Sequence, residues 1–184
     1  MREIKITTRY AKALLRLSVE ENLLDTISKD LKFVIDTIEK SHELKIVLKN
    51  PVIRNDKKIK ILTSIFDEKI SSVSLKFIQL IIRRHRAELL PDVINIFFSL
   101  RDDYLNIKPV IVKSAYELDS EIINRINEIL KNITGKEPRF KFQIDKSLIG
   151  GFIVQIDDTI YDGSIKHQLQ LLKQKFKLGT LSLN

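Results

Sequence analysis

The chain has 184 residues, of which 43% are apolar and 30% charged, and it contains no cysteine. This length suits one or two small domains that bury an adequate core, and the lack of cysteine excludes disulfides, thiolate metal sites and cysteine nucleophiles. The net charge of +8 is spread along the chain, with 20 basic and 15 acidic residues up to position 105 and 12 and 9 beyond it. Such charge permits nucleic acid, an anionic membrane surface or an acidic protein as partner, and selects none of them.

No segment of the sequence has the pattern of a membrane span or a targeting signal. No apolar run is longer than that from Leu80 to Ile82, which ends at Arg83, whereas a spanning helix needs about 20 apolar residues. The first residues lack the apolar core of a signal peptide. We therefore expect any attachment to a membrane to be indirect.

The first hundred residues predict one helix after another, because glycine is absent before position 135 and apolar residues recur at helical spacing. We expect Asp56 to cap the fourth helix, and the serines at 71 and 72 to begin the fifth. The fifth is apolar on most sides, which is typical of the central helix of a bundle. The six predicted helices lie at about 8–20, at 23–40, before Asn50-Pro51, at 56–67, at 71–86 and from Pro91 onward.

The pattern changes at Asn106 to the order strand, helix, strand, strand, strand, helix. Alternating or β-branched residues predict strands over 109–115, 139–145, 150–156 and 159–161, with a tight turn at Asp157-Asp158. We expect Asp119 and Ser164 to cap the two helices and Gly135 to end the first of them. The expected inward-facing residues are Ile122, Ile126, Ile129 and Ile133 on the first helix, Ile165, Leu169, Leu172 and Phe176 on the second, and Phe140, Phe142 and Ile144 on a half-buried strand. The predicted fold is an all-α six-helix N-terminal bundle, residues 1–105, followed by a small α/β C-terminal domain, residues 106–184.

No arrangement of residues predicts catalysis. Gly150-Gly151 lacks the spacing of a phosphate-binding loop and is typical of a bulge or a close backbone approach. Asp162, Ser164 and His167 fall within one turn of a helix start, where a cap explains Ser164 better than a catalytic triad does. We expect no catalytic residue, no cofactor, no metal and no small-molecule substrate.

Two binding functions remain open from the residues themselves. Basic clusters, for example Arg83, Arg84 and Arg86, could hold phosphates without regard to sequence. Aromatic residues are not interleaved with them, and helix ends favour basic residues in any case, so a nucleic-acid-binding module is the weaker reading. The second possible function is that of an adaptor that binds a helix of a partner protein. Ala11 and Ala13 favour it, because their small side chains leave room for a close neighbour. For one helix alone, however, packing in the chain's own core is the simpler explanation.

Three stretches of the sequence together resemble the δ subunit of F-type ATP synthases, called OSCP in mitochondria, over about residues 5–177. The first is RYAKAL at 9–14. The second is Asn50-Pro51 followed by RAELLPD at 86–92. The third and most specific is IDKSLIGGF at 144–152, followed by Asp162-Gly163-Ser164 and Leu169. The chain departs from the family pattern at Asp157, where glycine is frequent, and at Lys166-His167.

The resemblance implies a non-catalytic stator connector that holds the catalytic head still, so that proton flow is coupled to ATP synthesis. In this family the N-terminal bundle binds N-terminal helices of α subunits, and the C-terminal part binds the C-terminal end of the b-subunit stalk. The implied location is peripheral, at the cytoplasmic face of the bacterial cell membrane, with membrane contact only through the complex and no nucleic acid bound. The implied α-subunit groove, between the first and fifth helices, comprises Tyr10, Ala13, Leu14, Leu17, Phe77, Leu80 and Ile81, some of which must face the core. The structural signature of the C-terminal domain comprises Gly150, Gly151, Asp162, Gly163 and Ser164.

Overall fold

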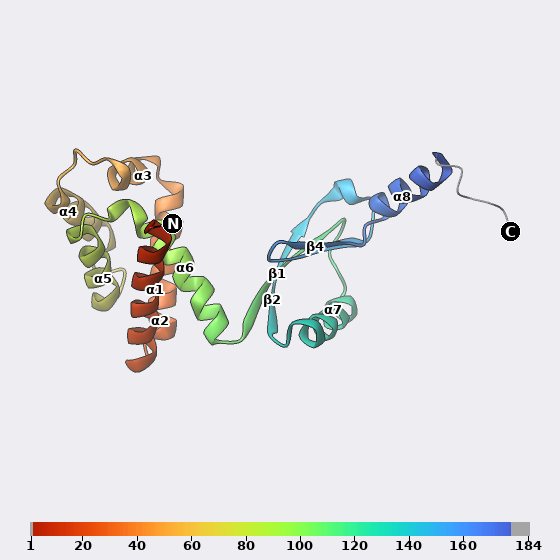
Figure 1. The fold of residues 1–184 in the computed structure, drawn as a ribbon, viewed down its shortest axis with the longest axis horizontal. Coiled ribbons are helices and arrows are strands. Elements are labelled where there is room, and N and C mark those ends of the chain that lie inside the picture. The colour runs from red at the N-terminus through yellow and green to blue at the C-terminus, as the bar shows by residue number, and fades with distance from the viewer. Residues whose placement is uncertain (1, 178–184) are drawn as a thin grey trace. The chain divides into compact units, whose positions relative to one another are not determined.

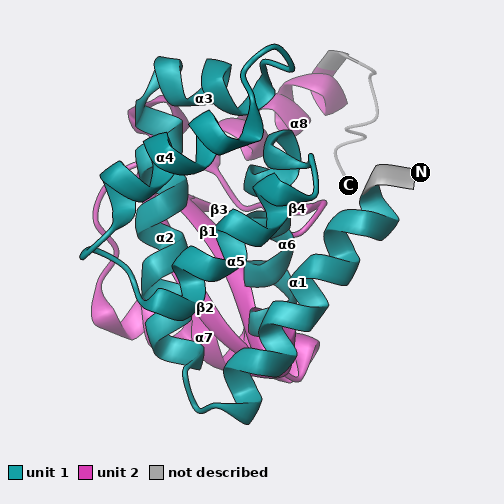
Figure 2. Cartoon of the chain, turned by 90° about the vertical axis from the view of Figure 1, so that its left-hand side faces the viewer, with its two compact units in different colours: residues 1–101 teal, residues 102–184 magenta. Residues whose placement is uncertain are grey.

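The computed structural model describes residues 2–177 and divides into two compact units, residues 1–101 and 102–184 (Figures 1 and 2). The sequence pattern places the change of character four residues later, after position 105. Among the described helices, none combines the length and the apolar character that crossing a bilayer requires. Each unit is described below by itself.

The first unit is helical throughout its described part. Its elements are α1 (Arg2–Glu20), α2 (Leu24–Lys40), α3 (His42–Lys49), α4 (Asn55–Phe66), α5 (Ser72–Arg83), a short 3-10 turn (Ala87–Leu89) and α6 (Leu90–Tyr104), whose last three residues belong to the second unit. The predicted helices are thus present, with α1 starting about six residues earlier than expected. The helix α5 ends three residues earlier than expected, where the backbone reverses through His85 at φ +58°. The expected cap of α4 was wrong, because Arg54 holds the N-cap position and Asp56 lies inside the first turn.

One apolar core holds this unit together. It draws on α1, α2, α3, α4, α5 and α6, and its fully buried side chains include Ile27, Leu31, Ile38, Leu62, Phe66, Ile78, Ile81, Ile82, Ile94 and Phe97. Each side chain of this size contributes about 1.5–3 kcal/mol when it leaves water. Ile78, Ile81 and Ile82 of α5 are fully buried in the core, whereas Leu80 on the same helix is 42% exposed. The helix therefore packs into the core and remains open to solvent at Leu80.

A buried carboxylate joins α2 to the start of α5. Asp30 accepts hydrogen bonds from the backbone N–H of Ser71 at 2.9 Å and from the hydroxyl of Ser74 at 2.8 Å. The Ser71 hydroxyl also accepts the N–H of Ser74, which confirms the predicted cap at the start of α5. A negative charge at a helix N-terminus is favourable, so Asp30 adds a long-range contact to a local cap.

The second unit has a four-stranded sheet in the order β2-β1-β3-β4. Its strands are β1 (Ile107–Ser114), β2 (Glu137–Ile144), β3 (Phe152–Ile156) and β4 (Thr159–Asp162), and its helices are α7 (Ser120–Thr134) and α8 (Ile165–Lys177), with a 3-10 turn at Lys146–Leu148. β1 pairs in parallel with β2 and antiparallel with β3, which pairs antiparallel with β4. The predicted order of strands and helices is confirmed, and Gly135 ends α7 in the left-handed conformation as expected.

The helix α7 packs on one face of this sheet and covers part of it. The shared core consists of Val110, Val112, Ile126, Leu130, Val154 and Ile156, with Phe140 and Phe152 at its margin. The predicted inward stripe of α7 was wrong for Ile129 and Ile133, which are 50% and 64% exposed, and Leu130 takes their place. On β2, Phe140 is partly buried against this core, whereas about half of Phe142 and of Ile144 is exposed. Of the three residues expected to face inward, only Phe140 therefore packs on the core. Asp119 holds the N-cap position of α7 without a capping bond from its side chain.

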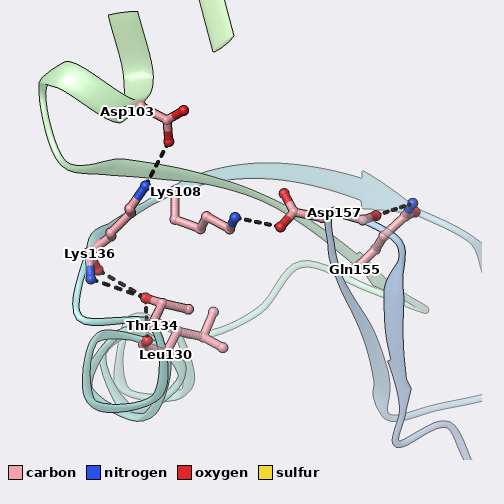
Figure 3. A network of polar contacts seen from close by, with 7 residues as sticks. All are labelled: Asp103, Lys108, Leu130, Thr134, Lys136, Gln155 and Asp157. Carbon is pink, nitrogen blue, oxygen red and sulfur yellow. Dashed lines mark hydrogen bonds and ion pairs between the residues drawn. The ribbon is translucent and has the colours of Figure 1, made fainter. Parts of the chain in front are cut away.

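Polar contacts tie the elements around β1 together (Figure 3). The ammonium of Lys136 lies 2.7 Å from the carboxylate of Asp103, in the last turn of α6. On the other side Lys108 pairs with Asp157, in the predicted turn between β3 and β4. The Thr134 hydroxyl donates to the carbonyl of Leu130 and accepts the N–H of Lys136. These contacts hold the end of α7 and the β3–β4 turn against the sheet.

Candidate protein-binding surfaces

The seven residues implied for an α-subunit groove separate into two groups. Leu14, Phe77 and Ile81 are buried in the core of the first unit, and their side chains are therefore not available to a partner. Ala13 is exposed, Leu17 and Leu80 are 40% and 42% exposed, and Tyr10 is half-buried. The burial of each side chain thus separates the residues that face the core from those that a partner could contact, a distinction that the sequence alone does not provide.

The accessible members of this group lie on two neighbouring helices. Tyr10, Ala13 and Leu17 follow one another at steps of three and four, which places them on one face of α1. Leu80 lies on α5, which runs beside α1 in both views (Figures 1 and 2). The guanidinium of Arg86, just after α5, lies 6.0 Å from the centre of the Tyr10 ring. We call Tyr10, Ala13, Leu17 and Leu80 the α1–α5 surface.

The two alanines of α1 have different surroundings. Ala11 is fully buried and packs in the core, so its small size serves contacts inside the first unit. Ala13 points outward, so its small size leaves the backbone of α1 open to close approach from outside. A partner helix could therefore approach closely at Ala13 and bury Leu17 and Leu80.

The helix α8 offers a second apolar surface. Its first turn is anchored, because the buried Ser164 hydroxyl accepts the N–H of His167 at 3.1 Å, as the predicted cap requires. Beyond this turn α8 extends away from the sheet (Figure 1). Its predicted inward stripe was wrong, since all four residues are 42–65% exposed. These residues, which we call the α8 stripe, are Ile165, Leu169, Leu172 and Phe176.

The charged residues within α8 itself are all basic. The helix contains four lysines and a histidine and no aspartate or glutamate. An exposed apolar stripe on a projecting helix is typical of a surface that a partner covers. The charge of α8 favours a partner segment that carries acidic residues.

The glycine motif and the Asp-Gly-Ser motif meet at the base of α8. The N–H of Gly163 donates to the carbonyl of Phe152, and the N–H of Ile165 donates to the carbonyl of Gly150, both at 3.0 Å. Gly151 has φ +74°, and a Cβ atom there would lie 2.4 Å from the carbonyl oxygen of Gly163. The two motifs therefore form a single contact, in which their main chains approach each other closely.

Asp162 completes this junction. Its carboxylate accepts the N–H of Ser164 at 2.9 Å. Hydrogen bonds from Ser164, assisted by the nearby charges of His167 and Lys166, hold the pKa of Asp162 below its ordinary value. The three residues that could suggest a triad are thus engaged in capping a helix. Among residues 2–177, no group of three or more His, Asp or Glu side chains is placed to hold a metal ion.

Comparisons with known proteins give consistent matches over nearly the whole chain. Residues 6–176 match the family described as ATP synthase delta (OSCP) subunit. The ATP synthase subunit delta of Chlorobaculum parvum is 44% identical over 165 residues, which is 90% of this chain and 91% of the relative. The protein of the same name from Chlorobium limicola is 35% identical over 181 residues, 98% of this chain and 100% of the relative.

The fold also has a counterpart among solved structures. A chain in the structure of the Toxoplasma gondii mitochondrial ATP synthase hexamer superposes with a TM-score of 0.63 at 18% sequence identity. The superposition covers 92% of this chain and 96% of that one. The α1–α5 surface and the junction at the base of α8 lie within residues 6–176, the part of the chain that the family model matches.

Proposed function

The chain belongs to the ATP synthase delta (OSCP) family, and from this premise we propose that it joins the catalytic head of a rotary F-type ATP synthase to the peripheral stalk. Its role in the enzyme is that of a non-catalytic stator subunit. In our proposal the helical bundle at residues 1–105 binds an N-terminal helix of an α subunit, and the α/β domain at residues 106–184 binds the C-terminal end of the b subunit. The protein would then lie peripherally, at the cytoplasmic face of the bacterial membrane.

The α1–α5 surface is the observation that carries the head-binding part of the proposal. Leu17 and Leu80 expose apolar area on neighbouring helices, and Ala13 leaves space next to it. An amphipathic helix laid on this surface buries apolar area worth about 25 cal/mol per Å², before the costs of association. This mode of recognition needs apolar anchors at helical spacing on the partner.

The α8 stripe supports the stalk-binding part. It gives the second unit an apolar surface with basic flanks, suited to an amphipathic helix that carries acidic residues. Two binding ends in one chain also help each other, because the second contact forms at high effective concentration once the first is made. A connector that must resist the torque of a rotor benefits from being held at both ends.

Calorimetric titration of the full chain with a peptide of its own organism's α-subunit N-terminus tests the head-binding end. We expect binding with a negative heat-capacity change, the mark of apolar burial, and little loss of affinity when salt is raised. A steep loss with salt would point instead to binding driven by charge, as nucleic acid requires.

A pair of arginine substitutions locates the site. Ala13→Arg places a long charged side chain on the α1–α5 surface and should weaken the peptide at least tenfold. Ser64→Arg makes a similar change on the exposed face of α4 and should leave affinity unchanged. A folded Ala13→Arg variant that binds like the wild type would overturn the assignment of the surface.

A further inference from the structure

The first unit has a third distinctive surface, at the end where α3, the loop at 50–54, the start of α4 and the connection after α5 come together. Three adjoining hollows of about 140, 450 and 390 Å³ open there. The first shares Asn55 and His85 with the second and Lys49 with the third. We call this combined surface the α3–α4 end.

Cations dominate the lining of the α3–α4 end. The three hollows are lined by Lys45, Lys49, Arg54, Lys58 and Arg83, together with His42 and His85. Asp56 and Glu88 are the acidic residues that line them. Five lysine and arginine side chains against two carboxylates leave the surface positive, and Arg54 already pairs loosely with Asp56 at 3.6 Å.

Lys58 is the unusual member of this group, because it is only 5% exposed. Its ammonium donates one hydrogen bond, at 2.8 Å, to the carbonyl of Leu48 in the last turn of α3. An ammonium has three donors, and a carbonyl dipole does not neutralise its charge. Burial lowers the pKa of Lys58, and the charge of Glu88 opposes that shift. A buried cation of this kind is stabilised when an anion reaches it.

The hollow beside Lys58 has the dimensions of a single acidic group. Its volume of about 140 Å³ corresponds to a few water molecules at about 30 Å³ each, which is room for a carboxylate and its stem. Asn55 and His85 line it and are joined side chain to side chain at 2.9 Å. This contact holds the His85 ring in position at the hollow.

Exposed apolar side chains lie among these cations. Val52 lines the second hollow and is 84% exposed, and Ile46 lines the third and is 49% exposed. A free inorganic anion would gain nothing from these side chains. An extended or helical protein segment with both acidic and apolar residues would use the cations and the apolar groups together.

We propose that the α3–α4 end binds an acidic segment of a partner protein, with one carboxylate received beside Lys58 and apolar side chains placed against Ile46 and Val52. The site uses none of the residues of the α1–α5 surface or of the α8 stripe. It is therefore an additional interface of the first unit, independent of the two contacts proposed above.

The test is a titration of the full, isotope-labelled chain with a capped hexaglutamate peptide at low salt, followed by backbone amide NMR shifts. Capped hexaglutamine and inorganic phosphate serve as the uncharged and non-protein probes. We expect hexaglutamate to shift the amides of residues 46–58 and 83–88. We expect hexaglutamine to shift none of them, and phosphate to bind at least tenfold more weakly. Equal binding by hexaglutamine, or phosphate binding as tight as hexaglutamate, would overturn the proposal.

Variants assign the binding to the α3–α4 end. Lys49→Glu and Arg83→Glu change exposed residues, so both variants should fold, and each should weaken hexaglutamate at least fivefold. Lys58→Met keeps most of the length of the side chain without its charge and should weaken hexaglutamate about tenfold, because one charge-assisted contact is lost. Lys29→Glu, an equal charge change on the exposed side of α2, should change affinity less than twofold. Lys49→Glu and Arg83→Glu variants that bind as well as the Lys29→Glu control would refute the site, whatever the stability of Lys58→Met.

Discussion

Arg139 on β2 holds the carboxylate of Asp102 with two parallel donors, Nη1 to Oδ1 at 3.0 Å and Nη2 to Oδ2 at 2.5 Å. The Asp102 side chain is 6% exposed, and that of Arg139 is 48% exposed. The planar guanidinium matches a carboxylate in this geometry, which makes such pairs stronger than ordinary hydrogen bonds. Because Asp102 lies in the last turn of α6, the pair fixes that turn to the sheet and explains why residues 102–104 belong to the second unit.

Replacing Arg139 should therefore destabilise the second unit. Arg139→Met keeps much of the apolar stem and removes two charge-assisted hydrogen bonds to a buried carboxylate, so we expect a loss of about 1–3 kcal/mol in the free energy of unfolding. Lys141→Met, two residues further along β2 and exposed, is the matched control and should change stability by less than about 0.5 kcal/mol. Urea unfolding measures both. Equal effects of the two substitutions would show that the pair contributes little.

The two adjacent glycines should respond differently to alanine. Gly151 has a positive φ, and an added Cβ would collide with backbone atoms, whereas at Gly150 it would meet the flexible end of Ile165 at 2.7 Å. Gly151→Ala should cost about 2 kcal/mol or more in stability, and Gly150→Ala clearly less, since a side chain can move. Thermal unfolding of the two variants compares them directly. A larger loss for Gly150→Ala would contradict the close approach seen at Gly163.

The second unit should lose stability in acid through carboxylates that cap or pair. Hydrogen bonds lower the pKa of Asp162 and of Asp145, and contact with Lys136 lowers that of Asp103. A depressed native pKa adds stability above the unfolded-state value of about 3.9. That stability is lost as the pH falls through the native pKa. Asp162→Asn should therefore make the unfolding free energy less dependent on pH between about 5 and 2.

A comparison at two pH values makes this test specific. The stability difference between wild type and Asp162→Asn should be smaller at pH 2.5 than at pH 6, because a growing fraction of the wild-type carboxyl is protonated as the pH falls. Asp158→Asn, at an exposed position in the turn between β3 and β4, makes the same chemical change and serves as the matched control. A constant difference across this range would mean that the capping bonds do not depend on the charge of Asp162.

The first unit should fold without the second. Every buried residue of its core lies between Ala11 and Phe97, so a fragment of residues 1–105 keeps the whole core and the complete α6. Circular dichroism should show a helical protein with a cooperative thermal transition, and the fragment should bind the α-subunit peptide with the affinity of the full chain. An unfolded fragment would place the domain boundary elsewhere.

Local patterns in the sequence predict most element positions, because caps and turns act over a few residues. Ser71, Gly135 and Ser164 each mark a helix end by their own chemistry, and the structure places them there. Asp30, by contrast, caps α5 from 41 residues away, and no local pattern indicates such a contact. The α8 stripe shows a different limit. Helical spacing identifies an apolar face correctly, but it does not tell whether that face meets the chain's own core or a partner.

The residues of the candidate surfaces likewise depend partly on local sequence and partly on tertiary packing. The motif RYAKAL identifies α1 but does not distinguish Leu14 from Leu17, which lie about one turn apart on that helix. Only the tertiary packing does so, because Leu14 is 2% exposed and Leu17 is 40% exposed. Lys58 appears in the sequence as one of three neighbouring lysines, with nothing to distinguish it from Lys57 or Lys60. Its burial results from the packing of α4 beside α3 and the turn before α6, a tertiary relationship that sequence spacing does not carry.

The junction at the base of α8 has a mechanical consequence. Two backbone hydrogen bonds connect the start of α8 to the segment around β3, one from Gly163 to Phe152 and one from Ile165 to Gly150. The backbone of Gly151 also packs closely against that of Gly163. The contacts at this junction are made by main-chain atoms, without flexible side chains between them. The helix can therefore bend or rotate only a little before those hydrogen bonds break. A pull on α8 would pass directly into the main chain around β3, and the joint would act as a stiff coupling and not as a spring.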